Sequence, residues 1–240
     1  MLKHAVVACL LFSNVIAQDS LSLNSASIPS TGYLDFNGYY DTRNHSEFTL
    51  NILGNTTKRF HYFSLTNYTG VTESSDLAQF YSEQNLRFKL SNESAFDASL
   101  QWALREGQDN DDIKWGLRIR FNDLQFLSKL FKKLNMSYSV STFIMELRQL
   151  NPVRYLTQLE HVYRIQVIPR LFGQRVYLSG FADQNMRYME GKQIIRWVTE
   201  HQLGIMLLKQ FYIVAEYRIN ELLSSKKQGM GYGFEYKMSF

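Results

Sequence analysis

The last twelve residues of the chain alternate between two kinds of side chain. The first kind is apolar or aromatic: Met230, Tyr232, Phe234, Tyr236, Met238 and Phe240. The second kind is small or charged: Gly231, Gly233, Glu235, Lys237 and Ser239. Successive side chains of a β-strand point to opposite faces of the sheet, so this period of two predicts a strand with one apolar and one polar face.

The same alternation recurs along most of the chain, with no break in composition that would separate two domains. We expect residues 33–240 to form one all-β unit. Its twelve strands are predicted near residues 33–42, 47–54, 59–69, 79–90, 96–106, 111–121, 135–148, 155–167, 174–184, 194–207, 209–219 and 229–240. Many of these segments reach the roughly 9 to 11 residues of a tilted membrane strand, and their number is even. The pattern predicts a transmembrane, antiparallel, up-and-down β-barrel of about 12 strands.

The start of the chain has the organisation of a secretory signal. Residues 1–17 combine a basic start, an apolar stretch and small residues before the expected cleavage site. Residues 18–32 are a Ser-rich segment that we expect to be a periplasmic lead-in. Cleavage removes the only cysteine, Cys9, so disulfides do not hold the mature chain, which suits the envelope of a Gram-negative bacterium.

Composition and charge narrow the class of protein further. The net charge falls from +4 to +3 when Lys3 is removed, since 25 Lys and Arg then face 22 Asp and Glu, and this excess is too small to imply nucleic acid. No apolar run after residue 17 approaches the roughly 18 residues of a membrane helix. We therefore expect an outer-membrane protein in contact with lipid, lipopolysaccharide and the barrel assembly machinery. No cofactor and no metal are expected, because the histidines lack ligand spacing and the acidic residues 109–112 resemble a solvated loop.

The connections between strands differ in character. Those rich in Gly, Asn, Asp or Ser are expected on the extracellular side, at residues 70–76, 107–112, 185–192 and 223–228. Tighter connections fall at residues 55–58, 91–94 and 207–208. Residues 123–134 carry apolar side chains at helical spacing with lysines opposite. They predict a short amphipathic helix on the periplasmic side, either packed on the barrel rim or anchored at the membrane surface.

In a membrane barrel the charged face must be the lumen, because a Lys or Arg that faces lipid at the midplane costs about 2 to 4 kcal/mol. In a soluble sandwich the same face would be the solvated surface. The predicted basic lumen residues are Arg87, Lys89, Arg105, Lys114, Arg118, Arg120, Arg164, Arg196, Arg218 and Lys237. The acidic ones are Asp35, Asp41, Glu83, Asp97, Glu160, Asp183, Glu200, Glu216 and Glu235. The two signs nearly cancel, and we expect most of these charges to pair across neighbouring strands.

Aromatic residues are also predicted to face inward: Tyr39, Phe60, Tyr62, Tyr68, Tyr81, Tyr177, Phe181 and Tyr212. A barrel of about twelve strands is wider than one filled by side chains and narrower than a sixteen-stranded porin. Aromatic rings beside balanced charges suit an uncharged solute with a flat ring better than an oligoanion.

Several short motifs resemble the Tsx-type nucleoside channels of the outer membrane. Residues 38–43, Gly-Tyr-Tyr-Asp-Thr-Arg, are similar to the first-hairpin pattern G-x-Y-x-T-R of that family, and residues 48–53, 59–64, 81–88, 178–183 and 231–234 extend the likeness. The closing strand also resembles the C-terminal assembly strand of outer-membrane proteins. The resemblance implies a monomeric twelve-stranded barrel whose lumen binds nucleosides. It makes Tyr39, Arg43, Tyr81, Glu83, Arg87 and Phe181 candidate lining residues, to which lumen parity adds Arg118 and Glu200.

We therefore expect a channel, not an enzyme, for passive and substrate-selective uptake of small polar solutes, nucleosides being those that the resemblance implies. One alternative is an oligosaccharide-acid porin of similar size, which would need an excess of Arg and Lys in the lumen. Another is an outer-membrane lipid hydrolase. His161 and His201 have the outward parity of a base in such an enzyme, but no serine motif accompanies them.

Overall fold

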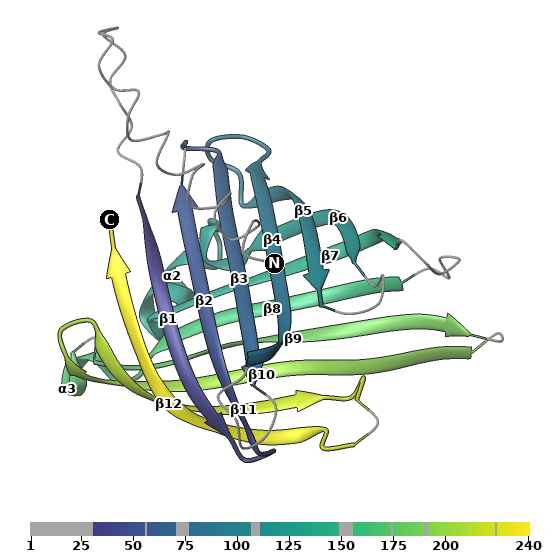
Figure 1. Ribbon diagram of the computed structural model, residues 1–240. Helices are drawn as coiled ribbons and strands as arrows, with labels where there is room; N and C mark the ends of the chain where they lie inside the picture. The colour runs from purple at the N-terminus through teal and green to yellow at the C-terminus, as the bar shows by residue number, and fades with distance from the viewer. Residues whose placement is uncertain are drawn as a thin grey trace, which may run out of the picture.

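A computed structural model describes residues 31–55, 57–70, 77–106, 111–148, 156–173, 175–189, 192–223 and 225–240. They form a closed barrel of twelve antiparallel strands, each paired with its neighbours in the chain, and β1 closes onto β12 (Figure 1). The strands are β1 (Thr31–Asp41), β2 (His45–Asn55), β3 (Phe60–Gly70), β4 (Leu77–Lys89), β5 (Phe96–Arg105), β6 (Asp112–Arg120), β7 (Met136–Arg148), β8 (Leu156–Gln166), β9 (Val176–Met189), β10 (Lys192–Leu208), β11 (Phe211–Asn220) and β12 (Gln228–Ser239). The predicted up-and-down barrel and its twelve strands are confirmed. The predicted signal and most of the lead-in lie outside the described residues.

The alternation in sequence becomes an alternation of environment along each strand. In β5 the side chains change regularly between exposed and buried along the strand. Its outward Trp102 is 48 % exposed, whereas its inward Ala103 is completely buried. Lipid solvates such an apolar outer band, and the barrel closes the backbone hydrogen bonds that a membrane cannot satisfy.

Both ends of the barrel chain lie at the same end of the cylinder. The backbones of Gly32 and Phe240 exchange hydrogen bonds of 2.9 and 3.1 Å there. The same end carries the three short helices of the described residues, η1 (Phe121–Asp123), α2 (Ser128–Leu134) and α3 (Pro169–Phe172). None of the described helices is long and apolar enough to cross a membrane.

Helix α2 confirms the second half of the amphipathic segment predicted over residues 123–134, and it rests on the barrel rim. Phe131 is buried, and its ring stacks on Tyr138 of β7 with 6.5 Å between centroids. Asn135 ends the helix in the left-handed conformation at φ 49° and donates its N–H to Lys132. Leu130 and Leu134 remain about half exposed.

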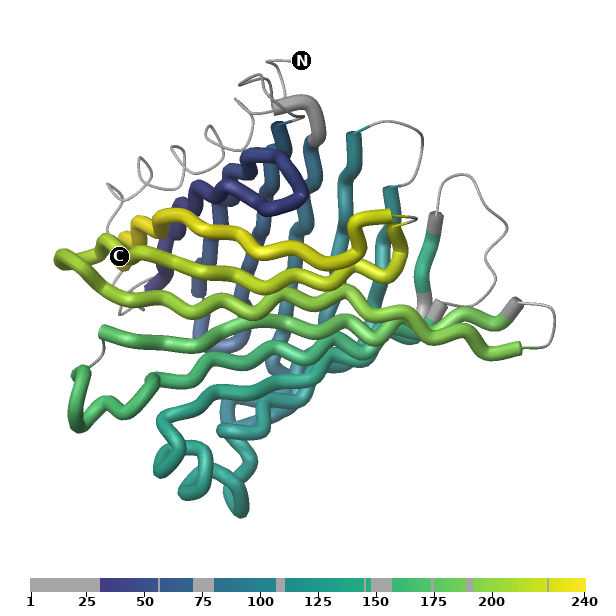
Figure 2. The backbone as a smooth tube through the Cα atoms, turned by 90° about the horizontal axis from the view of Figure 1, so that it is seen from below, coloured from purple at the N-terminus to yellow at the C-terminus, as the bar shows by residue number. Residues whose placement is uncertain are grey.

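The barrel is tallest at the β9–β10 hairpin. Strands β9 and β10 have 14 and 17 residues, whereas β5 and β6 have 10 and 9. The hairpin extends past its neighbours at the end opposite the chain termini (Figures 1 and 2). The rim at that end is therefore uneven.

A small aromatic cluster fills part of the barrel interior. Tyr39, Tyr177, Tyr212 and Val214 are buried together, and the Tyr177 and Tyr212 rings meet edge to face at 5.5 Å. The Tyr177 ring lies across Gly204 of the neighbouring strand, where a Cβ atom would lie only 2.2 Å from the ring. Glycine at position 204 therefore leaves room for the tyrosine.

We expect the substitution Gly204→Ala to lower the free energy of unfolding by about 1 to 3 kcal/mol, because overpacking must displace a ring that its neighbours hold. Urea unfolding of the refolded protein in lipid vesicles measures the change. Gly54→Ala is the control, since nothing lies within 4 Å of its added Cβ, and it should change stability by less than about 0.5 kcal/mol. Equal stability of the two variants would contradict this packing.

Candidate functional site

The barrel encloses a cavity of about 890 Å³. Its lining runs from residues near the β1–β2 and β11–β12 turns, such as Arg43 and Leu223, to residues near the terminal end, such as Tyr33 and Leu53. The described wall carries equal numbers of the two charges, seven acidic and seven basic. The acidic residues are Asp35, Glu47, Glu83, Glu160, Asp183, Glu200 and Glu235, and the basic ones are Arg43, Arg87, Arg105, Lys114, Arg164, Arg218 and Lys237.

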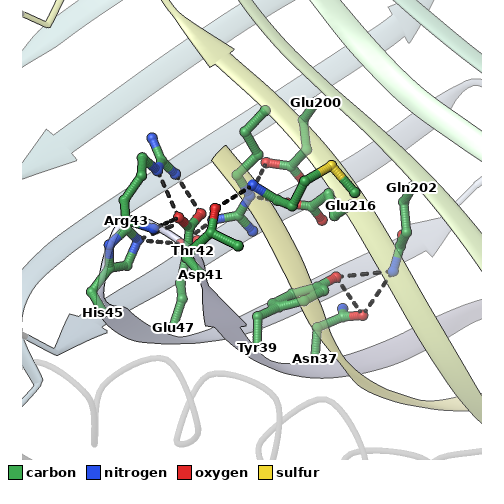
Figure 3. Close-up of polar contacts among 12 residues, drawn as sticks. Asn37, Tyr39, Asp41, Thr42, Arg43, His45, Glu47, Glu200, Gln202 and Glu216 are labelled. Carbon is green, nitrogen blue, oxygen red and sulfur yellow. Dashed lines mark hydrogen bonds and ion pairs between the residues drawn. The ribbon is translucent and has the colours of Figure 1, made fainter. Parts of the chain in front are cut away.

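At the end opposite the termini, the β1–β2 turn forms a tight charged corner (Figure 3). Arg43 donates from Nε and from a terminal nitrogen to the two carboxylate oxygens of Asp41 at 2.8 and 2.7 Å. The backbone N–H of Arg43 adds a third bond of 2.7 Å to the same carboxylate. The His45 ring lies between Asp41 and Glu47, at 3.8 Å from each. The bidentate pair with Asp41 fixes the Arg43 guanidinium at the opening of the barrel opposite the termini, which we call the mouth.

Arg218 of β11 is the centre of a larger network next to this corner. Its guanidinium donates to Glu47 and Glu216, and Glu200 lies 3.6 Å away. Its carbon Cζ stands 5.1 Å from the centroid of the Tyr39 ring. Three carboxylates therefore depend on one arginine, which is itself only 7 % exposed.

Nearer the terminal end, Tyr177 organises a second group. Its hydroxyl donates to Glu235 at 2.6 Å, and Glu235 also accepts from Lys237 at 2.8 Å. The Arg164 guanidinium carbon lies 4.0 Å from the centroid of the Tyr177 ring. Lys237 lies 3.2 Å from Asp35, its register partner across the β1–β12 pair. These contacts hold the ring and the paired charges together on this side of the lumen.

Strands β4 and β8, which face each other across the lumen, carry a third group. Glu83 accepts hydrogen bonds from the Tyr81 hydroxyl at 2.8 Å and from the Asn85 amide at 2.7 Å. Arg87 reaches across the lumen to Glu160 of β8, but the distance is 4.0 Å. This pair is looser than the ion pairs at the mouth.

The structure places the predicted site residues unevenly. Six of the eight line the cavity: Arg43, Tyr81, Glu83, Arg87, Phe181 and Glu200. Tyr39 faces inward but is buried in the wall, where its hydroxyl contacts Asn37 and Gln202 at 3.0 and 2.9 Å (Figure 3). Arg118 is held by Asp97 at 2.7 Å and does not line the cavity. These two residues stabilise the wall and do not face the solute space.

Three aromatic residues predicted to face inward lie on the outer face instead. The register of β3 with β2 and β4 puts Phe63, Leu65 and Asn67 on the lumen side, so Phe60, Tyr62 and Tyr68 point away from it. Tyr68 packs on Phe80 with 5.4 Å between ring centroids. Because β3 carries apolar residues on both faces, its parity alone does not identify the lumen side.

Glu47 is a lumen residue that the sequence analysis missed. It lines the cavity and accepts from Arg218. The signal is present in the sequence, since Glu47, Thr49 and Asn51 alternate with three apolar residues in β2. What the sequence does not reveal is that Glu47 pairs with Arg218, because Arg218 follows 171 residues later.

The two outward histidines are paired with tyrosines on the outer face. His161 Nδ1 lies 2.8 Å from the Tyr138 hydroxyl, and His201 Nδ1 lies 2.8 Å from the Tyr163 hydroxyl. Within the described part of the chain, neither ring has a hydrogen bond to a serine. These pairs satisfy polar groups in an apolar environment. Likewise, no group of three or more His, Cys, Asp or Glu among the described residues could hold a metal ion.

Comparison with known proteins gives a fold. No protein-family model matches the chain, and no curated protein matches its sequence. Among solved structures it is similar to the KdgM porin, with a TM-score of 0.52 and 12 % identity over 85 % of this chain and 98 % of that one. It is also similar to the NanC porin, with a TM-score of 0.56 and 6 % identity over 84 % of this chain and 97 % of that one. The fold is that of an outer-membrane β-barrel.

The outer-membrane barrel explains the distribution of side chains. Trp102, Trp115 and Leu117 are between 44 and 51 % exposed, as lipid-facing residues should be, while the charged groups turn inward. The chain is accordingly a protein of the Gram-negative outer membrane, in contact with its lipid.

We expect Arg218→Met to destabilise the barrel by about 3 to 5 kcal/mol, because it leaves three carboxylates without their shared cation. Urea unfolding in lipid vesicles measures the loss. Arg196→Met is the matched control: Arg196 is an exposed arginine on the β10 strand, and its replacement should cost less than about 1 kcal/mol. If both variants unfold at the same urea concentration, Arg218 does not hold the wall.

Proposed function

We propose that this protein is a passive channel for small polar solutes that carry no net charge. The observation that supports this function is the balance of the cavity wall, where seven carboxylates face seven basic groups. A wall with an excess of one sign concentrates ions of the opposite sign and repels the others. A balanced wall instead offers donors and acceptors that replace the water around a neutral solute.

Aromatic rings add a second kind of contact in the same space. Phe63, Tyr81 and Phe181 line the cavity on β3, β4 and β9. Such rings stack on flat, partly apolar solutes, and stacking on a nucleic-acid base is worth about 1 to 3 kcal/mol. With the motifs that resemble the Tsx-type channels, they make nucleosides the first uncharged solutes to test.

An oligosaccharide-acid porin is the competing function. One solved structure similar to this chain is the KdgM porin in complex with disordered oligogalacturonate, with a TM-score of 0.50 and 12 % identity. Identity this low concerns the fold alone. An oligoanion requires a lumen with excess positive charge, and the described wall of this cavity has none.

We further propose that residues 1–17 direct export and that the alternation of β12 is read by the barrel assembly machinery. Both steps belong to delivery, and neither affects what the lumen selects.

Single-channel recording in a planar lipid bilayer tests the function. We expect stepwise conductance, nearly equal permeability to K⁺ and Cl⁻ in a salt gradient, and concentration-dependent block by uridine or adenosine. Block by oligogalacturonate together with anion selectivity would favour the competing porin. Absence of any conductance would overturn the channel itself.

We expect Phe181→Ala to weaken nucleoside block roughly tenfold, since one stacking ring is lost. The matched control is Phe234→Ala, which removes the same ring from the lipid-facing side, where Phe234 is 55 % exposed. The blocking constant in single-channel recordings is the measurement. If the Phe234 variant weakens block as much as the Phe181 variant, the effect is not a lumen contact.

A further inference from the structure

Two carboxylates face each other on neighbouring strands inside the cavity. Glu160 of β8 and Asp183 of β9 are direct register partners, and both line the cavity. Like charges directly opposite one another destabilise a sheet. Glu83 faces both from β4 across the lumen and interacts electrostatically with each. Tyr81 and Asn85 hold Glu83 in place through their hydrogen bonds.

The basic residues around these three carboxylates do not fully pair with them. Lys114 donates to Gln158 at 2.7 Å and lies 3.8 Å from Asp112. Arg87 stands 4.0 Å from Glu160, well beyond the 2.7 to 2.9 Å of a direct charge-assisted hydrogen bond.

Buried polar atoms of both signs remain without hydrogen-bond partners at this point. Arg87 is 9 % exposed and Glu160 is 8 % exposed. Arg87 Nε, Glu160 Oε2 and Asp183 Oδ1 each have no hydrogen-bond partner. Such atoms are costly to bury unless something else binds them. Arg87 therefore keeps an unused donor, and Glu160 and Asp183 each keep an unused acceptor, on side chains that line the same cavity.

We propose that Arg87, Glu160, Asp183 and Glu83 form a subsite for a small zwitterion that carries an ammonium beside a carboxylate, such as an α-amino acid. The ammonium has three donors, which match three carboxylates, and the solute carboxylate accepts from the guanidinium of Arg87. The subsite rests on the proposed channel function and adds zwitterions of this class to the net-neutral solutes that the channel takes.

Other occupants fit the four residues less well. A free anion would meet three carboxylates, and a simple cation would make no use of the Arg87 guanidinium. The described residues provide no cluster able to hold a metal ion. Two rings border the subsite: Phe63, at 5.7 Å from the guanidinium carbon of Arg87, and Phe181, two residues before Asp183 on the same face. They would pack against an apolar side chain of the solute.

Three probes that share the phenylalanine side chain and differ in net charge test the subsite on the wild-type channel in a lipid bilayer. They are L-phenylalanine, which is a zwitterion, L-phenylalaninamide, which is a cation, and N-acetyl-L-phenylalanine, which is an anion. We expect the zwitterion to block the current at about tenfold lower concentration than either of the others. Equal block by all three, or stronger block by the anion or the cation, would overturn the subsite.

Variants then assign the effect to the carboxylates. We expect Asp183→Asn and Glu160→Gln each to weaken block by L-phenylalanine about tenfold while the conductance steps remain. Asp123→Asn is the control, because Asp123 is a carboxylate outside the cavity that pairs with Arg120 at 2.5 Å. If the control weakens block as much as the two variants, the subsite is wrong.

The two proposals fail in different ways. A channel that conducts but does not prefer the zwitterion removes the subsite and leaves the channel intact, whereas a protein that does not conduct removes both. If a variant does not insert into the bilayer, the three probes on the wild-type channel still decide the question.

Discussion

Closure of the sheet on itself is the constraint from which the rest of the structure follows. Lipid offers no partner for a backbone N–H or C=O, so every strand needs a neighbour on both sides. The β1–β12 pair supplies the last one, and its register depends on close approach: a Cβ on Gly233 would lie 1.8 Å from the Gly38 carbonyl oxygen. That same register sets Asp35 opposite Lys237, so one backbone requirement also fixes a lumen ion pair.

Once the barrel is closed, the ionised side chains on the inner face must find partners within the lumen. Most are satisfied by neighbours, as Arg218 is by Glu47 and Glu216, and these networks hold the wall in one arrangement. A buried charge that is only partly satisfied is the exception. Arg87 and Glu160 line the cavity but stand apart from the tight networks around Arg218 and Tyr177.

The sequence predicts the barrel well because alternation is a local property of each strand. Twelve strands, the helix near residue 130 and most inward residues follow from it. It fails where a strand is apolar on both faces, as in β3, and there only pairing with β2 and β4 decides the lumen side. Alternation also does not distinguish an inward residue that lines the cavity from one that is held within the barrel wall. Arg118 is an example, because its position depends on Asp97 of the neighbouring strand. The sequence pattern does not predict that Glu83 faces Glu160 either, because the two residues lie on strands that do not pair with each other.

The uneven rim makes the barrel higher on one side than on the other. Strand β10 has 17 residues and β6 has 9, which at about 3.3 Å per residue is a difference of roughly 26 Å along the strand direction. Under the proposed channel function, a solute that enters at this rim meets the raised β9–β10 side before it reaches the shorter strands. Because Asp183 lies on β9 and pairs in register with Glu160 of β8, this raised side is continuous with the part of the wall that carries both carboxylates.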